Sequence, residues 1–449
     1  MRLEQDSLGT LQLSTEEYYG ISTARLLAAA GSFGPEVSSL LLRNIVMVRQ
    51  AQALVFGRNG AWNATVAESI QAAANQLLTN EQFFAEQIKV RVSHGGGARS
   101  LVVNVDEVLA NVALEMQGRP RGEYHRLAGL FQLDTGFSNH NVCLMALHVT
   151  IVQMLDEISG QFGEAIHWLR NHALAMQEQN SIAQINYQDI KIHSLGEVFS
   201  CRADGLSFIK QQLFGYRKEL CRLWNETPEV LACLKELLDI EIEYDASKKD
   251  FPVNDVLYSG LSGLLKNLAT FLLQFCNELK RLVVLRKELD LPNQLPSQVF
   301  NPVGREMIAL DTVSQMSVVV VGNDAMIAAA LNIHDSGGVL SFNLISNALI
   351  DSLRYSSVAV KMLTKQCLME LRGNPEMGAA LQENSPLQAE KLIPIIGYDR
   401  AVQVARISAL TAKPVKTVVV RMKLLNEAQA ETLFFAGCSE GQFDDQRTQ

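Results

Sequence analysis

The sequence predicts a mainly α-helical protein built around a bundle of long helices, and two patterns support this prediction. The first is a scarcity of proline, with 11 residues in a chain of 449. No proline falls inside residues 121–227, 253–291 or 303–374. A proline within a helix removes a hydrogen bond and clashes with the preceding turn, at a cost of about 3 kcal/mol. The three intervals therefore leave room for long helices.

The second pattern is a regular apolar stripe in the middle interval. Apolar residues recur there at alternating steps of four and three: Leu261, Leu265, Leu268, Leu272, Phe275 and Leu279. A repeat of about 3.5 residues is typical of helices that pack side by side at a small angle. We expect one helix over most of residues 254–289. A helix of that length exceeds the width of a small domain, which predicts a bundle or an oligomer.

Other parts of the chain show weaker versions of the same pattern. They predict long helices over residues 142–180, 199–224, 306–331 and 339–371, with breaks near 180–188, 244–252, 291–302 and 333–338. The N-terminal part carries turn signals at Gly57–Gly60 and Gly95–Gly97, so we expect shorter mixed elements there. Short helices are expected around residues 398–407 and 425–434.

Composition excludes several classes of protein. Hydrophobic residues make up 48% and charged residues 19%, enough for a large core. The net charge is −9 and no basic stripe is present, which argues against nucleic acid as a partner. The N-terminus lacks the apolar run of a signal peptide. The most apolar later run, residues 316–333, is interrupted by Gly322, Asn323 and Asp324, so we expect no membrane span.

The cysteines and histidines predict neither disulfides nor a metal site. The seven cysteines are scattered and form no CxxC pair, which is typical of free thiols in a reducing cytoplasm. No histidine or cysteine group has the spacing of metal ligands, and the chain has no GxGxxG or P-loop motif. We therefore expect a cytoplasmic protein without a metal or nucleotide cofactor.

Several segments carry recognisable motifs, in order along nearly the whole chain. They are the opening residues Arg2, Glu4, Asp6, Gly9, Tyr19, Gly20, Thr23 and Arg25, the helix-like stretch Asn104–Asn111, Gln188–Asp189, Ser194–Glu197, Asn301–Val303 with Glu306, Val321–Asp324 and Ile396–Asp399. Together these segments resemble the aspartase/fumarase superfamily, which includes aspartate ammonia-lyase and class II fumarase.

The resemblance implies a subunit of three parts and a homotetramer. A mixed, mostly helical N-terminal domain would cover residues 1–138, a long central bundle 139–385, and a small helical domain 386–449. In the family, four bundles pack together and active sites form at subunit junctions from separate segments. That arrangement agrees with the apolar stripe, because long half-apolar helices need partners to cover them.

The resemblance also implies a reaction. Family members add or remove ammonia or water across the double bond of fumarate. A serine in a mobile loop removes the proton, and a lysine and an asparagine of that loop stabilise the doubly charged aci-carboxylate. A threonine–serine pair, an SSND segment and a THLQD segment bind the substrate.

This sequence departs from the family at nearly every one of those points. The base serine falls at Pro292 and the loop lysine at Gln298, so neither a hydroxyl nor a charge is present there. The THLQD histidine becomes Asn186, and the threonine of the first segment becomes Arg99 beside a retained Ser100. We therefore expect that the ordinary family mechanism does not operate.

Three interpretations follow from these departures. The protein is a catalytically inactive scaffold that serves as a binding or assembly subunit, or a subunit completed by a paralogue, or an enzyme with new chemistry in the old cleft. The third is our hypothesis, with a small carboxylate-bearing or otherwise anionic substrate. Arginine can hold a carboxylate through two hydrogen bonds, and histidine can act as an acid or a base near neutral pH.

The hypothesis assigns roles to ten residues. The catalytic candidates are His140, Glu306 and Asn186, and the substrate-binding candidates are Arg99, Ser100, Ser138, Asn139, Asn141, Gln188 and Asn301. Arg99, Ser100, His140, Asn186 and Glu306 are expected to converge on one pocket.

Each candidate also has a plain structural interpretation. His140 suits the start of a helix or an interface, Arg99 suits a surface or intersubunit salt bridge, and Asn186 suits a position that has drifted. For two further histidines the structural interpretation is preferred. His94, beside the three glycines at 95–97, is expected in a flexible surface turn, and His148 in the core.

Overall fold

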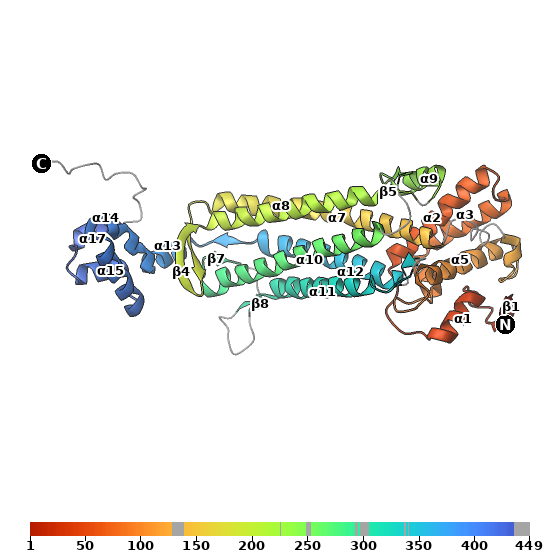
Figure 1. Cartoon of the computed structure of the whole chain (residues 1–449), viewed down its shortest axis with the longest axis horizontal. Coiled ribbons are helices and arrows are strands. Elements are labelled where there is room, and N and C mark those ends of the chain that lie inside the picture. The colour runs from red at the N-terminus through yellow and green to blue at the C-terminus, as the bar shows by residue number, and fades with distance from the viewer. Residues whose placement is uncertain are drawn as a thin grey trace. The chain divides into compact units, whose positions relative to one another are not determined.

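The computed structural model describes residues 1–127, 139–224, 226–247, 253–291, 295–296, 305–335, 338–339 and 341–434, and these residues are mostly helical (Figure 1). They fall into two compact units. Unit 1 comprises residues 1–162, 208–272 and 315–360, and unit 2 comprises 163–207, 273–314 and 361–449. The division into three domains stays a prediction.

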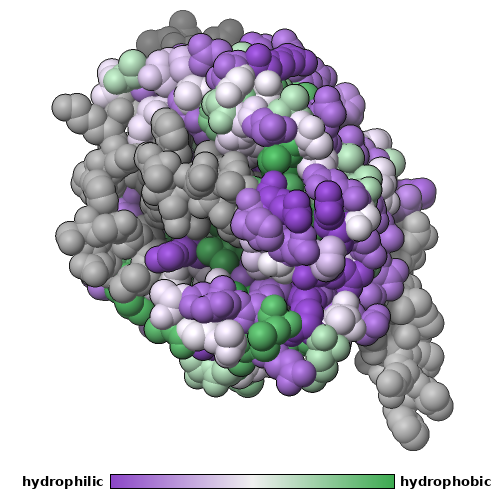
Figure 2. Space-filling view, turned by 90° about the vertical axis from the view of Figure 1, so that its right-hand side faces the viewer, coloured by the Kyte–Doolittle hydropathy of each residue, from purple (hydrophilic) through white to green (hydrophobic). Residues whose placement is uncertain are grey.

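The N-terminal part of unit 1 begins with a hairpin and continues as helices. Strands β1 (Arg2–Asp6) and β2 (Gly9–Leu13) pair antiparallel. The helices that follow are α1 (Ile21–Ala30), α2 (Ser39–Arg58), α3 (Ala64–Thr79), α4 (Glu81–Gln87), α5 (Gly97–Met116) and the short η1 (Tyr124–Leu127). Both α2 and α5 have 20 residues, so the prediction of shorter elements is wrong for these two. The surface of this part is largely hydrophilic, with apolar residues in small separate patches outside the grey atoms (Figure 2).

Five long helices occupy the predicted intervals. They are α7 (Asn139–Ala175), α8 (Leu195–Leu220), α10 (Val253–Lys280), α11 (Ile308–Ala330) and α12 (Phe342–Leu363). Helix α10 continues into the π-helical η3 (Arg281–Leu285), and α12 into the π-helical η4 (Thr364–Leu368). Every residue of the predicted apolar stripe in α10 is at most 2% exposed. The helical period of that stripe is confirmed.

Four polar contacts and one close approach in unit 1 join the five helices in a ring. The Arg217 guanidinium of α8 binds the Asp156 carboxylate of α7, and a Cβ on Gly260 of α10 would meet the Tyr216 hydroxyl of α8. The remaining neighbours are joined by Lys266 Nζ to Asp324 Oδ2, at 2.6 Å, by Asn323 Nδ2 to Ser352 Oγ, at 3.1 Å, and by Ser357 Oγ to Gln161 Oε1, at 3.0 Å. These pairs run α10 to α11, α11 to α12 and α12 to α7, which closes a five-helix bundle.

Short elements connect the long helices. Parallel β5 (Arg222–Leu223) and β6 (Glu243–Tyr244) flank α9 (Pro228–Leu238). Antiparallel pairs are formed by β7 (Leu289–Asp290) with β12 (Arg372–Gly373), β8 (Leu295–Pro296) with β9 (Arg305–Glu306), and β10 (His334–Asp335) with β11 (Gly338–Val339). Pro228 stands at the start of α9 after the N-cap Thr227, where a missing backbone N–H costs nothing.

Unit 2 contains the other parts of the long helices and a hairpin that sequence patterns did not predict. Strands β3 (Asn180–Ile185) and β4 (Gln188–Ser194) pair antiparallel across the predicted break near 180–188. Helix α13 (Pro375–Asn384) lies against β3, where the Asn180 side chain donates to Gln382 at 2.8 Å. Ser385 donates to Asp189 of β4 at 2.6 Å, which holds the hairpin to the segment after α13.

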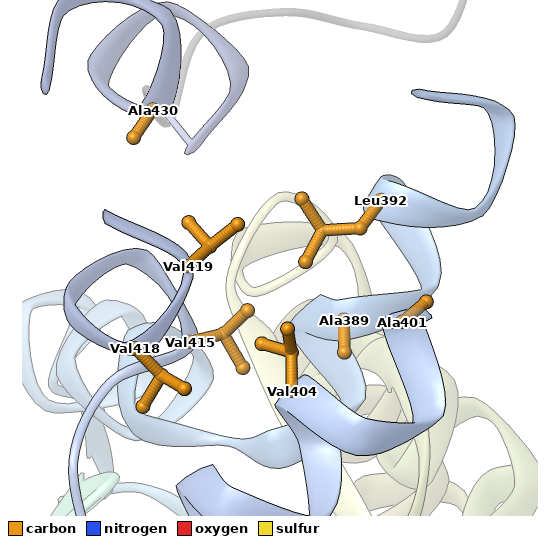
Figure 3. Packing of buried hydrophobic residues seen from close by; sticks show 8 residues of the cluster. All are labelled: Ala389, Leu392, Ala401, Val404, Val415, Val418, Val419 and Ala430. Atoms are coloured by element: carbon orange, nitrogen blue, oxygen red, sulfur yellow. The ribbon is translucent and has the colours of Figure 1, made fainter. Parts of the chain in front are cut away.

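The C-terminal helices of unit 2 enclose a small core of their own (Figure 3). They are η5 (Pro386–Leu392), α14 (Ile393–Ile396), α15 (Tyr398–Thr411), α16 (Val415–Arg421) and α17 (Glu427–Phe434). The core residues are small or β-branched apart from one leucine: Ala389, Leu392, Ala401, Val404, Val415, Val418, Val419 and Ala430. The short helices predicted around residues 398–407 and 425–434 are α15 and α17.

Three helices are long and apolar enough, by length and composition alone, to cross a membrane: Asn141–Ala175, Asp255–Leu285 and Ile308–Ala330. The third helix contains most of the apolar run at 316–333, and it is longer than that run because it begins at Ile308. The expectation of no membrane span there stays a prediction. Protein atoms already bury 72% of the first helix's apolar window, but only 28% of the third's. Helix α11 therefore has an apolar surface that one chain leaves largely uncovered.

Candidate functional site at three helix N-termini

Three glycines shape the start of α5. Gly96 and Gly97 have φ of 85° and 56°, a left-handed backbone that glycine adopts without the steric cost of a Cβ. The helix begins directly after this turn, and no side chain caps its N-terminus. The first N–H groups of a helix have no partner within it and form the positive end of its dipole. The beginning of α5 is thus suited to a negatively charged group.

Arg99 and Ser100 lie in the first turn of α5. The Arg99 side chain is exposed and has no hydrogen bond or ion pair to another described residue. The alternative of a surface salt bridge therefore has no partner for Arg99 among the described residues, and the intersubunit salt bridge stays a prediction. Ser100 is half-buried, and its hydroxyl donates to the Gly97 carbonyl at 2.9 Å. The same oxygen accepts from Asn343 Nδ2 at 3.4 Å.

The first turns of α7 and α12 meet the start of α5. Cys143 of α7 donates through its thiol to the Ala98 carbonyl at 3.5 Å, and Asn343 is the second residue of α12. Burial raises the pKa of the Cys143 thiol, so this group stays protonated near neutral pH. The N-terminal turns of three helices, far apart in sequence, therefore gather around Ala98 and Ser100.

The predicted residues of the middle segment lie at the start of α7. Asn139 and His140 are its first two residues, and their side chains lie outside the described atoms, as does the whole of Ser138. Asn141 is buried, with 9% of its surface exposed. Two positions further on, Cys143 contacts Ala98, so the start of α7 lies near the first turn of α5.

His94 lies just before the glycine turn and is not on a flexible surface. It is 6% exposed, and its Nδ1 accepts from the Arg91 backbone N–H at 3.2 Å. Burial, followed by the nearby Arg91 charge, lowers the pKa of His94 below its ordinary value. The histidine is therefore neutral at pH 7, and the prediction of a flexible turn is wrong for this side chain. His148, in contrast, is 1% exposed, as expected of a core residue.

Asn186 and Gln188 lie in unit 2, at the tip of the β3–β4 hairpin. Both side chains are exposed. Asn186 and Tyr187 form the two-residue loop with φ of 50° and 63°. Tight hairpins need left-handed residues at both loop positions, and asparagine is favoured at the first. Turn geometry thus favours asparagine at position 186, and a catalytic role of Asn186 stays a prediction.

The other predicted residues of unit 2 are described only in part. Glu306 pairs with Leu295 in the β8–β9 ladder, and its side chain lies outside the described atoms. Asn301, Pro292 and Gln298 lie outside the described residues. Arg99 and Ser100 share unit 1 with residues 139–141, whereas Asn186, Gln188 and Glu306 belong to unit 2. Their convergence on one pocket stays a prediction.

Asn343 and Cys143 belong to the site but were not predicted from the sequence. Asn343 is 1% exposed, and its Oδ1 has no hydrogen-bond partner among the described residues. A buried polar atom of this kind usually has a ligand or a water beside it. One signal was present: Asn343 is a polar residue at the start of the apolar pattern over 339–371. Among the described residues, no group of three His, Cys, Asp or Glu side chains could hold a metal ion.

The chain is similar over almost its full length to curated proteins named aspartate ammonia-lyase. The protein from Corynebacterium glutamicum is 26% identical over 462 residues, which cover 96% of this chain and 86% of the relative. The protein from Escherichia coli is 25% identical over 465 residues, covering 97% and 95%. No protein-family model matches the chain.

Solved structures share the fold. A fumarate lyase:delta crystallin from Brucella melitensis superposes with a TM-score of 0.84 at 24% identity, covering 97% of this chain and 99% of the other. A class II fumarase from Schistosoma mansoni gives 0.83 at 18% identity, covering 96% and 98%. The mainly helical architecture of this chain is therefore the fold of these structures. At 25–26% identity to proteins named aspartate ammonia-lyase, the chain is similar in sequence to members of the aspartase/fumarase superfamily.

Proposed function

We propose that this protein is a divergent lyase-like enzyme that acts on a small carboxylate-bearing or otherwise anionic substrate by non-standard elimination or addition chemistry. The observation that carries the proposal is the meeting of the α5, α7 and α12 N-termini around Ala98 and Ser100, with Arg99 between these two residues in the sequence. It is not an ordinary aspartase or fumarase, because Pro292 and Gln298 stand where the family's base serine and loop lysine are expected.

The charges at this place favour an anion. Arg99 is a cation in the first turn of a helix, next to the positive end of the helix dipole, where a cation is unfavourable by about 0.3–1 kcal/mol. A bound carboxylate would accept hydrogen bonds from the free amides of α5 and from the guanidinium together. Binding would thus relieve a repulsion that exists in the free protein, and Ser100 and Asn343 would orient the ligand.

The chemistry requires a base and a stabilised oxyanion. Removal of a proton next to a carboxylate places a second negative charge on its oxygens, which preorganised donors and a cation stabilise. Arg99 and the α5 amides supply these donors in our proposal. His140 acts as the base, Asn186 and Glu306 complete the catalytic set, and Ser138, Asn139, Asn141, Gln188 and Asn301 contact the substrate.

The assembly belongs to the proposal. A homotetramer, alone or with a paralogue, would cover the apolar surface of α11, where Val318 and Val319 are 60% and 41% exposed. It would bring the hairpin tip of one copy to the site of another. On this account the protein is cytoplasmic, the apolar helices face protein and not lipid, and neither nucleic acid nor a cofactor takes part.

The alternative is a catalytically inactive pseudoenzyme that binds an anion or assembles with other subunits. The observation in its favour is Pro292, because proline can neither accept nor donate a proton through its side chain.

Two assays test the proposal. Incubation with fumarate plus ammonia, with aspartate and with malate, followed by ultraviolet absorbance of the fumarate double bond, should show no turnover. Appreciable turnover would contradict the claim of non-standard chemistry. A thermal-shift screen of small carboxylates and phosphates should then find ligands that raise the Tm of the wild type but not of Arg99→Ala. If no anion raises the Tm, the proposed site is wrong.

A further inference from the structure

A cleft lies between α7 and α8 in unit 1, away from the candidate site. Its volume is about 350 Å³, within the range of small-molecule sites. The walls are apolar: Leu155, Ile158 and Phe162 come from α7, and Leu213 and Phe214 from α8. Phe214 is 65% exposed, so a large aromatic surface stands open at this cleft.

Charged side chains line the same cleft, and one of them has no partner. The Arg217 guanidinium donates to Asp156 through two of its nitrogens, with 2.8 Å between Nη2 and Oδ2, so these two charges neutralise each other. Lys210 is half-buried and has no ion pair or hydrogen bond to another described residue. The cleft therefore combines apolar walls with one uncompensated positive charge.

This combination selects the chemistry of a ligand. A neutral apolar molecule would fill the walls but leave the Lys210 ammonium unpaired. A small hydrophilic anion would pair with the ammonium but leave the walls in contact with water. A molecule with an apolar body and one carboxylate satisfies both. We propose that the cleft binds a hydrophobic monocarboxylate, its carboxylate accepting from Lys210 and its body packing on Phe162, Leu213 and Phe214.

The cleft is distinct from the candidate site. Both involve α7, but Asp156 follows Asn139 by 17 positions on that helix, which is roughly 25 Å at 1.5 Å per residue. The two places also differ in character. The candidate site is formed by helix N-termini and polar side chains, whereas the cleft has walls of leucine, isoleucine and phenylalanine. A ligand in the cleft would therefore not compete directly with a small anion at α5.

Calorimetric titration of the full-length protein with octanoate tests this inference. We expect saturable binding, and clearly weaker binding of octanol, which has the chain without the charge. Lys210→Gln should weaken octanoate binding about tenfold, the usual scale for loss of a hydrogen bond to a charged group. Lys218→Gln is the matched control, because Lys218 is an exposed lysine on the same helix outside the cleft, and it should bind as the wild type does.

A second pair of variants separates this site from the other. Ser159→Trp places a large ring in the cleft and should abolish octanoate binding. Arg99→Ala should leave it unchanged. Circular dichroism and Tm establish whether Ser159→Trp folds. If it does not fold, the comparison of Lys210→Gln with Lys218→Gln tests the inference alone. The inference is overturned if the wild type shows no saturable binding, if Lys210→Gln binds as tightly as Lys218→Gln, or if succinate displaces octanoate.

Discussion

At the scale of single residues, the buried ion pair of Arg49 and Asp106 anchors the helix that carries the candidate site. Arg49 of α2 is 1% exposed, and its guanidinium donates to both carboxylate oxygens of Asp106 in α5, at 2.8 and 2.6 Å. Arg49 also donates to Gln52 at 3.0 Å, and Gln52 donates to Glu226 at 2.5 Å. These bonds fix α5 against its neighbours.

Removal of one partner of the Arg49–Asp106 pair should therefore lower the stability of the folded protein. Asp106→Ala leaves an uncompensated buried guanidinium, and we expect a loss of about 3–5 kcal/mol in the free energy of unfolding. Glu123→Ala is the control, since it removes a partly exposed pair with Arg126 and should cost less than about 1 kcal/mol. Urea unfolding of the two variants measures the difference. Similar losses for both would show that the buried pair does not anchor α5.

The sequence predicted some site residues because their signals are local. The three glycines before Arg99 and Ser100 mark a special backbone, and the structure has a left-handed turn there. Asn343 has only its polarity at the start of an apolar pattern as a signal, and its contact with Ser100 spans 243 positions. Burial of this asparagine follows from the packing of α12 on α5, which periodicity within either helix does not reveal.

At the scale of elements, close backbone contact fixes the start of α8 on the end of α7. A Cβ at Gly196 would lie 2.3 Å from the Ala173 carbonyl oxygen and 3.0 Å from Gln177 Cα. Both neighbours are backbone atoms, which cannot swing aside. The glycine in the family-like segment Ser194–Glu197 is therefore explained by packing between helices.

Gly196→Ala should lower the Tm. Overpacking typically costs about 1–3 kcal/mol, and here the obstructing atoms are backbone. Gly160→Ala, in the exposed interior of α7 where a Cβ meets nothing within 4 Å, should raise stability by about 0.5–1 kcal/mol. Differential scanning calorimetry compares the two. A Gly196→Ala protein as stable as the wild type would contradict the close approach.

His172 links α7 to η4 and should make stability depend on pH. It is 7% exposed, and its Nε2 lies 2.6 Å from the Leu368 carbonyl, to which the neutral ring donates. Burial lowers the pKa of His172 in the folded protein. The unfolded chain therefore binds a proton near pH 6.5 that the folded protein resists, so folding stability falls as pH decreases through that value.

His172→Gln removes this titration while keeping a donor for Leu368. Between about pH 8 and pH 5, the Tm of the variant should fall less than that of the wild type. His167→Gln is the control, because His167 on the same helix is exposed. Parallel Tm curves for the wild type and His172→Gln would contradict a neutral buried histidine.

Helices with a strong apolar period were predictable, whereas the β3–β4 hairpin was not. The seam of α10 is visible in sequence because burial on one side repeats every three or four residues. The hairpin, in contrast, is short and carries exposed apolar residues, Ile185, Tyr187 and Ile190, at its tip. The alternation of apolar and polar residues in the hairpin is too weak to distinguish it from a loop between two helices.

At the scale of the whole molecule, the uncovered apolar surface of α11 favours an assembly. The proposed homotetramer has four times the mass of the 49.6 kDa chain. Val318→Glu places a charge on the exposed apolar face of α11, so the mass of the assembly in detergent-free buffer should be lower than that of the wild type. Light scattering after size exclusion measures this, with Lys218→Gln as an exposed control. A wild-type protein that is monomeric would refute the tetramer.

The central claim is that a small anion binds at the start of α5, beside Arg99. Calorimetric titration with succinate, and separately with inorganic phosphate, tests it most directly. We predict that at least one of these anions binds the wild type, and that its affinity for Arg99→Ala is at least tenfold lower. The control Arg58→Ala removes an exposed arginine at the end of α2, and its affinity for the anion should equal that of the wild type. Absence of binding to the wild type, or equal affinity in Arg99→Ala, would contradict the claim.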